Sequence, residues 1–255
     1  MFLHGIGGGR INWITQTPAF PDFTTIAWDA RGYGASDDYD SDLAFTDFAD
    51  DVVRVLDQLG VERAHLVGLS MGARILMDFF ARYPDRVATL TLCDCFYGFR
   101  SSLTPEKQQE FLDLRERPLR SGRTLEDLAP ALVDSLIGHK ASVAAREALT
   151  RSIIALHVES YLKTLRATVT FERADDLADF DVPVQLIFGS DDRLTPPSIG
   201  EEMLTLLPQA RLHVIEDAGH LSNIEKPDEF NRVLRDFLDE YRGLASWITD
   251  PDRKG

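Results

Sequence analysis

The segment that most constrains this chain is Gly68-Leu69-Ser70-Met71-Gly72. It follows an apolar run, residues 64–67, and leads directly into a helical pattern that starts at Arg74. A serine on so tight a strand-to-helix turn takes a strained backbone conformation, which lifts its hydroxyl clear of the sheet. The strand and helix then approach so closely that the positions two residues before and after the serine hold almost no side chain, and both are glycine. We therefore expect Ser70 at the end of a strand, facing a substrate, with helix N–H groups directed at it.

The same five residues also fit an ordinary strand-turn-helix unit, so the rest of the chain must decide. Helical spacing of apolar residues runs through 42–59 and stops at Gly60, and it recurs at 198–207 and 228–241. Short apolar runs at 24–28, 87–93, 182–189 and 211–215 predict strands. Alternation of strands and helices predicts an α/β fold with a mostly parallel sheet, covered by helices on both faces.

Residues 96–180 change this rhythm, because strand signals vanish from them. Helical segments are expected at 105–117, 125–136, 142–157 and 161–168, punctuated by prolines such as Pro118 and Pro130. We expect a helical cap insertion over one end of the sheet. The predicted organisation is therefore a core at 1–95, a cap at 96–180 and a second part of the core at 181–255.

Composition narrows the range of partners. The chain has 255 residues, enough for one α/β core with an insertion, and a net charge of −15 from 42 acidic and 27 basic residues. Such a surface repels phosphate backbones and anionic lipids, which argues against nucleic acid and membrane partners. No apolar run reaches the roughly 20 residues that span a bilayer, and the start lacks the features of a signal peptide. We expect a cytoplasmic protein.

The two cysteines, Cys93 and Cys95, are too close in sequence for a comfortable disulfide. We expect reduced, buried thiols, as in a cytosolic protein. Further ligands at suitable spacing are missing near them, so no metal site is predicted.

A serine hydroxyl becomes a good nucleophile only when a base removes its proton. His220 is the best candidate, because it lies in a loop just after a predicted strand and near the end of the chain. The other five histidines lie in predicted strands, in the insertion or beside a glycine-rich loop, and structural roles are expected for them: His4, His65, His139, His157 and His213.

The base in turn needs an acid that holds it in one tautomer. The segment 189–196 follows a predicted strand and contains two competing carboxylates, Asp191 and Asp192. Asp94, after the strand at 87–93, is an outside possibility, and a merely solvated loop is the plain alternative for the acidic pair. The order Ser, Asp, His with each residue at a strand end is far more specific than any single piece.

A glycine-rich segment, His4-Gly5-Ile6-Gly7-Gly8-Gly9, follows the first apolar residues. A phosphate-binding loop is one interpretation, but the Gly-Lys-Ser/Thr ending is absent. The better interpretation is a loop whose backbone N–H groups face Ser70 and form half of an oxyanion hole.

These motifs together resemble the α/β-hydrolase superfamily over nearly the whole chain. The resemblance rests on the glycine loop, the turn at 29–36, the serine motif, Gly189 with Asp192 third after it, and Ala218-Gly219-His220. It implies that Asp192 is the acid and that the N–H groups of Ile6 and Met71 form the oxyanion hole. Residues 219–227 are loosely similar to the enol-lactonase and meta-cleavage-product hydrolase branches.

Members of this family usually carry two more strands before the His-Gly loop, and we expect these two strands to be missing here. The strand expected at 24–28 would then lie at a bare sheet edge, which pairs readily with another chain. We predict either an N-terminally trimmed sequence or weakened stability with self-association, so a homodimer is a possible state.

The activity that the resemblance implies is two-step acyl transfer through Ser70 on a small, fairly apolar ester or lactone, without a metal or organic cofactor. Carbon–carbon bond hydrolysis of a ring-fission product and a slow-turnover ligand-binding receptor are the alternatives. Dehalogenase chemistry is disfavoured, because that branch places aspartate at the nucleophile position. Four aromatic residues could line the pocket, with core packing as the alternative for each: Trp13, Phe96, Tyr97 and Phe99.

Overall fold

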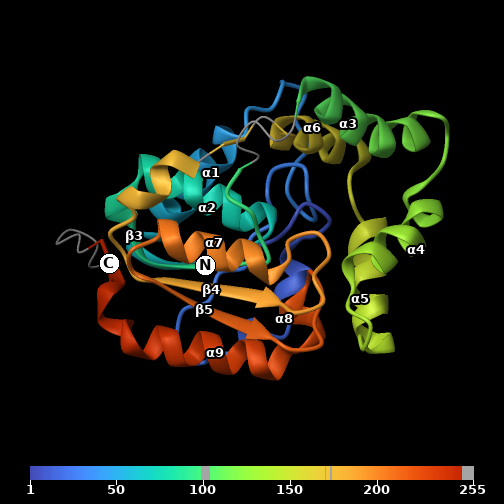
Figure 1. Ribbon diagram of the computed structural model, residues 1–255. Helices are drawn as coiled ribbons and strands as arrows, with labels where there is room; N and C mark the ends of the chain where they lie inside the picture. Colours follow the sequence, from blue (N-terminus) through green and yellow to red (C-terminus); the bar gives the residue numbers. More distant parts are fainter. Residues whose placement is uncertain (99–103, 170, 173, 249–255) are drawn as a thin grey trace.

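The structure, a computed structural model, describes residues 1–98, 104–169, 171–172 and 174–248. Its sheet is the predicted α/β arrangement (Figure 1). Five parallel strands follow one another across the sheet: β1 (Phe2–Leu3), β2 (Val61–Leu69), β3 (Val87–Cys93), β4 (Val184–Gly189) and β5 (Ala210–Ile215). A short strand, β6 (Ser246–Trp247), pairs antiparallel with the start of β2.

The register aligns the carboxyl ends of the strands. Leu69 of β2 pairs with Cys93 of β3, and Cys93 pairs with Ile187 of β4. Gly189, the last residue of β4, pairs with Ile215, the last of β5. The loops that follow β2, β3, β4 and β5 therefore all leave the sheet at the carboxyl ends of its strands, where side chains from distant parts of the sequence can meet.

Alternate strand residues pack into separate cores on the two faces of the sheet. In β2, Leu66 belongs to one apolar cluster and Val67 to the other. The first cluster lies between the sheet and the helices α1 (Thr46–Leu59), α2 (Met71–Arg82) and α7 (Pro197–Leu206). The second lies between the sheet and α9 (Pro227–Glu240), on the opposite face (Figure 1). The expected helix at 42–59 begins later, at Thr46, and ends where predicted, because Gly60 takes the left-handed conformation with φ 71°.

Among the described residues, four α-helices lie between β3 and β4, and we call them the cap helices: α3 (Pro105–Arg120), α4 (Leu125–Leu136), α5 (Val143–Ile154) and α6 (Val158–Val169). Within 104–169 the structure assigns helices and turns and no strand. Figure 1 shows α4 and α5 beyond the arrowheads of β4 and β5. The predicted end of α3 at residue 117 is wrong, because the helix continues to Arg120. Pro118 lies inside its last turn, where a proline removes only a local hydrogen bond.

The strand expected at 24–28 is not formed, because only Ala27 bridges to Phe2. The N–H of Phe2 donates to the Ile26 carbonyl (2.7 Å), and the N–H of Trp28 donates to the Phe2 carbonyl (3.3 Å). Since β1 has only two residues, it offers no further ladder pair to this segment. The segment lies beside β1 without forming the predicted edge strand, and association of two copies through it stays a prediction.

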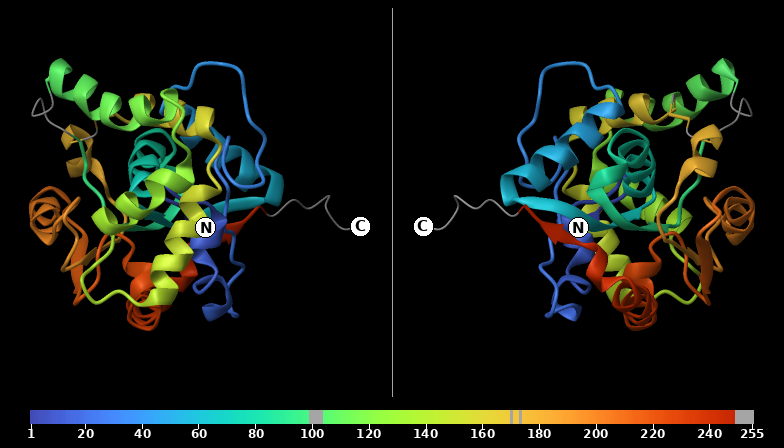
Figure 2. Two further views of the ribbon diagram at one scale, coloured as in Figure 1. Left: turned by 90° about the vertical axis from the view of Figure 1, so that its right-hand side faces the viewer. Right: turned by 90° about the vertical axis from the view of Figure 1, so that its left-hand side faces the viewer.

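Both ends of the described chain contact β2 (Figure 2). The ammonium of Met1 donates to the His65 carbonyl (2.7 Å), and burial lowers the pKa of this ammonium to about 5. A cavity of about 350 Å³ lies beside β2, and the residues that line it include Phe23, His65 and Trp247. Ser70, Asp192 and His220 do not line it.

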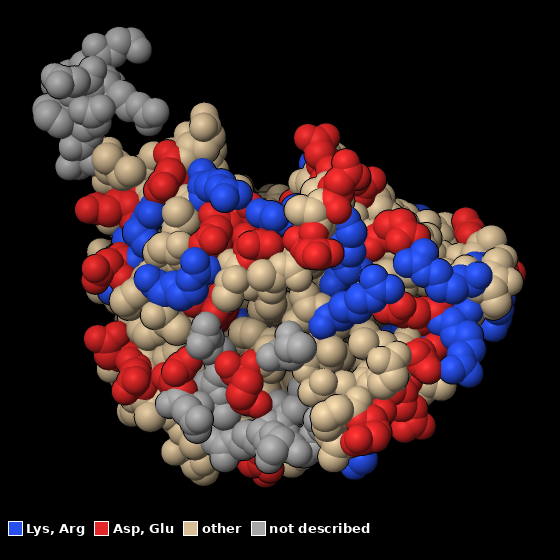
Figure 3. All heavy atoms as spheres, turned by 90° about the horizontal axis from the view of Figure 1, so that it is seen from above, with Lys and Arg blue, Asp and Glu red and all other residues tan. Residues whose placement is uncertain are grey.

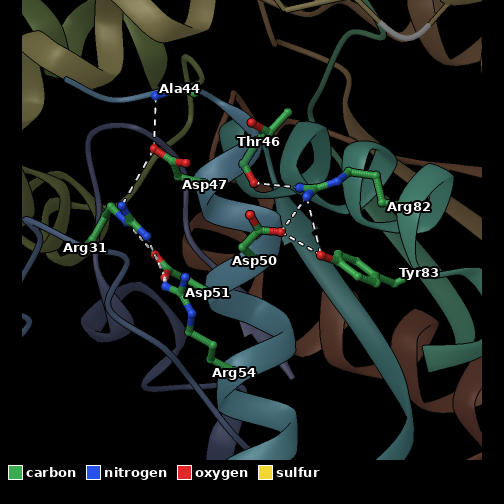
Figure 4. Close-up of polar contacts among 9 residues, drawn as sticks. All are labelled: Arg31, Ala44, Thr46, Asp47, Asp50, Asp51, Arg54, Arg82 and Tyr83. Carbon is green, nitrogen blue, oxygen red and sulfur yellow. Dashed lines mark hydrogen bonds and ion pairs between the residues drawn. The ribbon is translucent and has the colours of Figure 1, made fainter. Parts of the chain in front are cut away.

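Ion pairs fix α1 to its neighbours (Figure 4). Arg31, in the turn at 29–36, holds Asp51 of α1 through Nε and Oδ2 at 2.6 Å. On the other flank, Arg82 at the end of α2 and the hydroxyl of Tyr83 each lie 2.6 Å from Asp50. These contacts link the turn, α1 and α2, and the apolar packing that α1 and α2 share holds the helix that begins after Ser70 in place.

The surface is mixed in sign on the face seen in Figure 3, where acidic and basic side chains alternate. Cys93 and Cys95 are free and buried, as predicted, and burial raises the pKa of both thiols. Among the helices of the described residues, none is both long and apolar enough to cross a membrane.

Candidate active site

Ser70 lies between the last residue of β2 and the first of α2, with the strained backbone that the sequence predicts (φ 53°, ψ −111°). Its N–H donates to the Cys93 carbonyl at 2.8 Å, which pins the turn to β3. The two flanking glycines are needed for different reasons. A Cβ on Gly68 would lie 2.5 Å from the backbone of the helix, whereas a Cβ on Gly72 would lie 2.2 Å from the Leu3 carbonyl oxygen.

His220 reaches this serine from the loop that follows β5. Its Nε2 lies 2.9 Å from Ser70 Oγ. The ring is only 5% exposed, and the N–H of the residue donates to the carbonyl of Leu136 in α4 at 2.7 Å. The imidazole is therefore held between the core and the cap helices.

Asp192 comes from the loop after β4 and holds the other ring nitrogen. Its Oδ2 lies 2.7 Å from His220 Nδ1, and the residue is 3% exposed. The other oxygen, Oδ1, accepts from the N–H groups of Leu194 (2.8 Å) and Thr195 (3.0 Å). The Thr195 hydroxyl donates to Oδ2 at 2.6 Å. Sequence reasoning did not identify Thr195, although an aspartate that binds backbone two and three residues later is a common turn.

The electrostatics of this pair favour its charged form. Burial disfavours the imidazolium, but the charge and hydrogen bond of Asp192 outweigh this penalty, so the pKa of His220 lies above its ordinary value of 6.5. Burial likewise opposes ionisation of Asp192, but the charge of His220 and hydrogen bonds from His220 and Thr195 keep the Asp192 pKa below its usual value. With Nδ1–H donating to Asp192, Nε2 can accept the proton of Ser70.

The two other carboxylates that the sequence left open have different partners. Asp191 points toward the cap helices, where its Oδ2 accepts from the N–H of His139 (3.1 Å) and contacts the His139 ring. Asp94 accepts from the Gly189 N–H (2.8 Å) and from the Ser222 hydroxyl (2.6 Å). Burial and the nearby charge of Asp192 raise the pKa of Asp94 to about 8. Asp94 thus joins the last residue of β4 to Ser222, the residue that follows the loop after β5.

The glycine loop passes next to the serine. The N–H of Gly8 donates to the Gly5 carbonyl at 3.0 Å, which closes a turn with Ile6 in its middle, so the turn's own bond does not use the Ile6 N–H. A Cβ on Gly5 would lie 3.4 Å from Ser70 Cβ. Met71 is the first residue of α2, and the first N–H groups of a helix lack intrahelical partners.

His4 braces this loop from behind. Its Nδ1 lies 2.8 Å from the Gly5 carbonyl oxygen, and its Nε2 accepts from the Ala30 N–H at 3.0 Å. Burial lowers the pKa of His4 to about 4, so the ring is neutral at pH 7. The loop is therefore tied to the turn at 29–36.

The three aromatic pocket candidates that the structure describes have different surroundings. Trp13 is fully buried in the core, with its ring centroid 5.0 Å from Phe2, so core packing accounts for it. The Tyr97 hydroxyl donates to Glu202 of α7 at 2.9 Å. Phe96 is half-buried, with the Arg74 guanidinium 4.3 Å from its ring centroid. Phe99 lies outside the described residues.

The remaining histidines make structural contacts. His65 Nδ1 lies 2.9 Å from the Thr89 hydroxyl, His157 contacts Asp38, and His213 contacts Glu229. In the part of the chain that the structure describes, no group of three or more His, Cys, Asp or Glu side chains could hold a metal ion.

Comparison with known proteins agrees with this geometry. A family model described as "alpha/beta hydrolase fold" matches residues 1–227. A 2-hydroxy-6-oxononadienedioate/2-hydroxy-6-oxononatrienedioate hydrolase from Paraburkholderia phymatum is 32% identical, over 93% of this chain and 86% of its own length.

Solved structures resemble the chain over a similar extent. A thermophilic esterase from Thermogutta terrifontis is 27% identical with a TM-score of 0.87, over 94% of this chain and 89% of its own. The enol-lactonase from Burkholderia xenovorans is 24% identical with a TM-score of 0.81, over 93% and 90% of the two chains, and shows the shared fold.

Proposed function

The chain belongs to the α/β-hydrolase family, and within it we propose a serine hydrolase that cleaves a carboxylic ester or lactone of a small, fairly apolar substrate. The observation that carries the proposal is the hydrogen-bonded series Asp192, His220 and Ser70, with distances of 2.7 and 2.9 Å. A serine on a strained turn, a buried base and a buried acid that aligns the base are the parts that acyl transfer needs.

In the proposed mechanism, Ser70 Oγ attacks the substrate carbonyl while its proton passes to His220 Nε2. The resulting oxyanion accepts hydrogen bonds from the N–H groups of Ile6 and Met71, and each such donor typically contributes about 3 kcal/mol. His220 then gives the proton to the leaving alcohol, and an acyl-enzyme remains on Ser70. Water, deprotonated by His220, releases the acid and restores the hydroxyl of Ser70. Every proton transfer uses protein groups or water, so no cofactor is invoked.

A related esterase of high structural similarity supports the ester substrate. A second candidate function is hydrolysis of a carbon–carbon bond in a ring-fission product, because the 32% identical relative carries that kind of substrate in its name. The same three residues could serve either reaction.

The test is hydrolysis of p-nitrophenyl acetate, butyrate, hexanoate and octanoate by wild type, Ser70→Ala and the control Ser135→Ala, an exposed serine of α4. We expect sustained turnover in wild type and in Ser135→Ala, with loss only in Ser70→Ala. Turnover that persists in Ser70→Ala would refute the proposal. A wild type that cleaves a vinylogous diketone and no ester would favour the second candidate.

A further inference from the structure

A short segment of the cap helices touches the loop that carries His220. We call residues 136–140 the cap turn, which comprises the last residue of α4 and the first part of its link to α5. We call residues 216–221 the histidine loop, which connects β5 to α8 (Ser222–Glu225). Figure 1 shows α4, α5 and α8 at the same end of the sheet. The N–H of His220 donates to the Leu136 carbonyl at 2.7 Å, so the backbone of His220 is bound to the cap turn itself.

The two segments are in backbone contact at a pair of glycines. A Cβ on Gly219 would lie 2.4 Å from the N of Gly138 and 2.5 Å from the Leu136 carbonyl oxygen. A Cβ on Gly138 would lie 2.8 Å from the N of Gly219. Real Cβ atoms do not approach other atoms this closely, so any side chain at either glycine would force the cap turn and the histidine loop apart.

One buried carboxylate joins these glycines. Glu225, the last residue of α8, accepts from the Gly219 N–H through Oε1 (3.1 Å) and from the Gly138 N–H through Oε2 (2.9 Å). Its side chain is shielded, since the residue is 9% exposed. Hydrogen bonds to a carboxylate in such a site are stronger than neutral ones, and loss of the carboxylate leaves two buried N–H groups without an acceptor.

We propose that Glu225 is a positioning residue for His220, and that the cap turn is a structural part of the histidine loop. On this account Glu225 fixes the peptide that precedes His220, and the cap turn fixes the N–H of His220, so Nε2 meets Ser70 only while the cap turn is docked. The proposal rests on the proposed function, because it assigns to His220 the role of base.

Other contacts of the cap turn contribute less to this docking. His139 contacts Asp191, and Lys140 Nζ lies 2.9 Å from Asp217. The His139 and Lys140 side chains are exposed while their carboxylate partners are partly buried, and ion pairs with an exposed partner contribute little to stability. The buried carboxylate is therefore the contact to test.

The experiment compares Glu225→Ala, Glu225→Gln and wild type on the p-nitrophenyl ester that wild type hydrolyses best. We expect Glu225→Ala to lower kcat by about 10- to 100-fold with little change in KM, because a displaced base slows chemistry and not substrate binding. The kcat of Glu225→Gln should lie between those of wild type and Glu225→Ala, because the amide keeps one acceptor oxygen. The matched control is Glu159→Gln, which removes an exposed pair with Arg120 elsewhere in the cap helices and should keep wild-type kcat.

A second variant approaches the contact from the cap side. Gly138→Ala should also lower kcat, whereas Gly243→Ala, where a Cβ would meet nothing within 4 Å, should not. Circular dichroism and melting temperature identify variants that fail to fold, and Glu225→Gln and Gly138→Ala then carry the test. Wild-type kcat in folded Glu225→Ala, or a loss confined to KM, would overturn the proposal.

Failure of this proposal is distinguishable from failure of the proposed function. If a fluorophosphonate probe does not label Ser70 in wild type, the proposed function fails. If wild type is labelled and Glu225→Ala is labelled at the same rate, the function stands and the positioning role is wrong.

Discussion

Helices α2 and α3 show how differently the two parts of this molecule are built. Ten of the twelve residues of α2 are buried, whereas none of the sixteen residues of α3 is. The first residue of α2 follows Ser70 directly, and the helix is enclosed by the sheet, α1 and β1. A helix held on all sides positions its N-terminal N–H groups firmly, and such precision suits a reaction centre.

The cap helices contact this core at several places, since the Ser152 hydroxyl of α5 donates to the Gly7 carbonyl and the Arg74 guanidinium of α2 donates to the Thr168 carbonyl of α6. One of these places is the cap turn, where backbone meets backbone around Gly138 and Gly219. The difference between α2 and α3 shows that the helix after Ser70 is fixed by burial, and we propose that the cap helices contribute to the reaction through the local contact with His220. The predictions that follow test this division.

The largest effect should separate two adjacent carboxylates. Asp192→Asn should lower kcat about ten-thousand-fold, because an amide can hold His220 in the wrong tautomer. Asp191→Asn, which faces the cap turn, should stay close to wild type. Rates for both variants and wild type should be measured across pH. In wild type, kcat/KM should fall as the pH drops through the pKa of His220, above 6.5, since only the neutral ring accepts the Ser70 proton. Equal losses of kcat in Asp192→Asn and Asp191→Asn would show that the two carboxylates do not differ in role.

A smaller effect should separate the two helices in stability. Leu76 of α2 is 0% exposed, and Leu76→Ala should lower the free energy of unfolding by about 2 to 5 kcal/mol. Leu114 of α3 is 68% exposed, and Leu114→Ala should change it by no more than about 0.5 kcal/mol. Urea denaturation followed by circular dichroism measures both. A large loss at Leu114 would mean that α3 is covered in solution.

The sequence predicts most of the candidate site because its chemistry restricts residue types at particular strand ends. A strained serine between glycines, a histidine after the last long strand and an aspartate after the strand before it are local patterns, and the structure brings them together. The end of α1 at Gly60 is likewise predicted by a local pattern, the end of the helical spacing of apolar residues.

Other features depend on contacts between distant segments, which leave no local pattern. Glu225 and Gly138 are 87 residues apart in the chain, and nothing near either predicts that they meet. The segment 24–28 has a strand pattern, but its neighbour β1 is too short to form a ladder with it. Trp13 is a large aromatic residue of the kind that can line a pocket, but it packs in the core. In each case the structure that a residue adopts depends on the distant segment that it contacts and not on its neighbours in the sequence.

The central claim is that His220 activates Ser70, and covalent labelling tests it most directly. Wild type and His220→Ala are treated with a fluorophosphonate, and the labelled peptide and its rate of formation are determined by mass spectrometry. The account predicts a single label on Ser70 in wild type and much slower labelling in folded His220→Ala. A label on another residue, or labelling of His220→Ala at the wild-type rate, would contradict it.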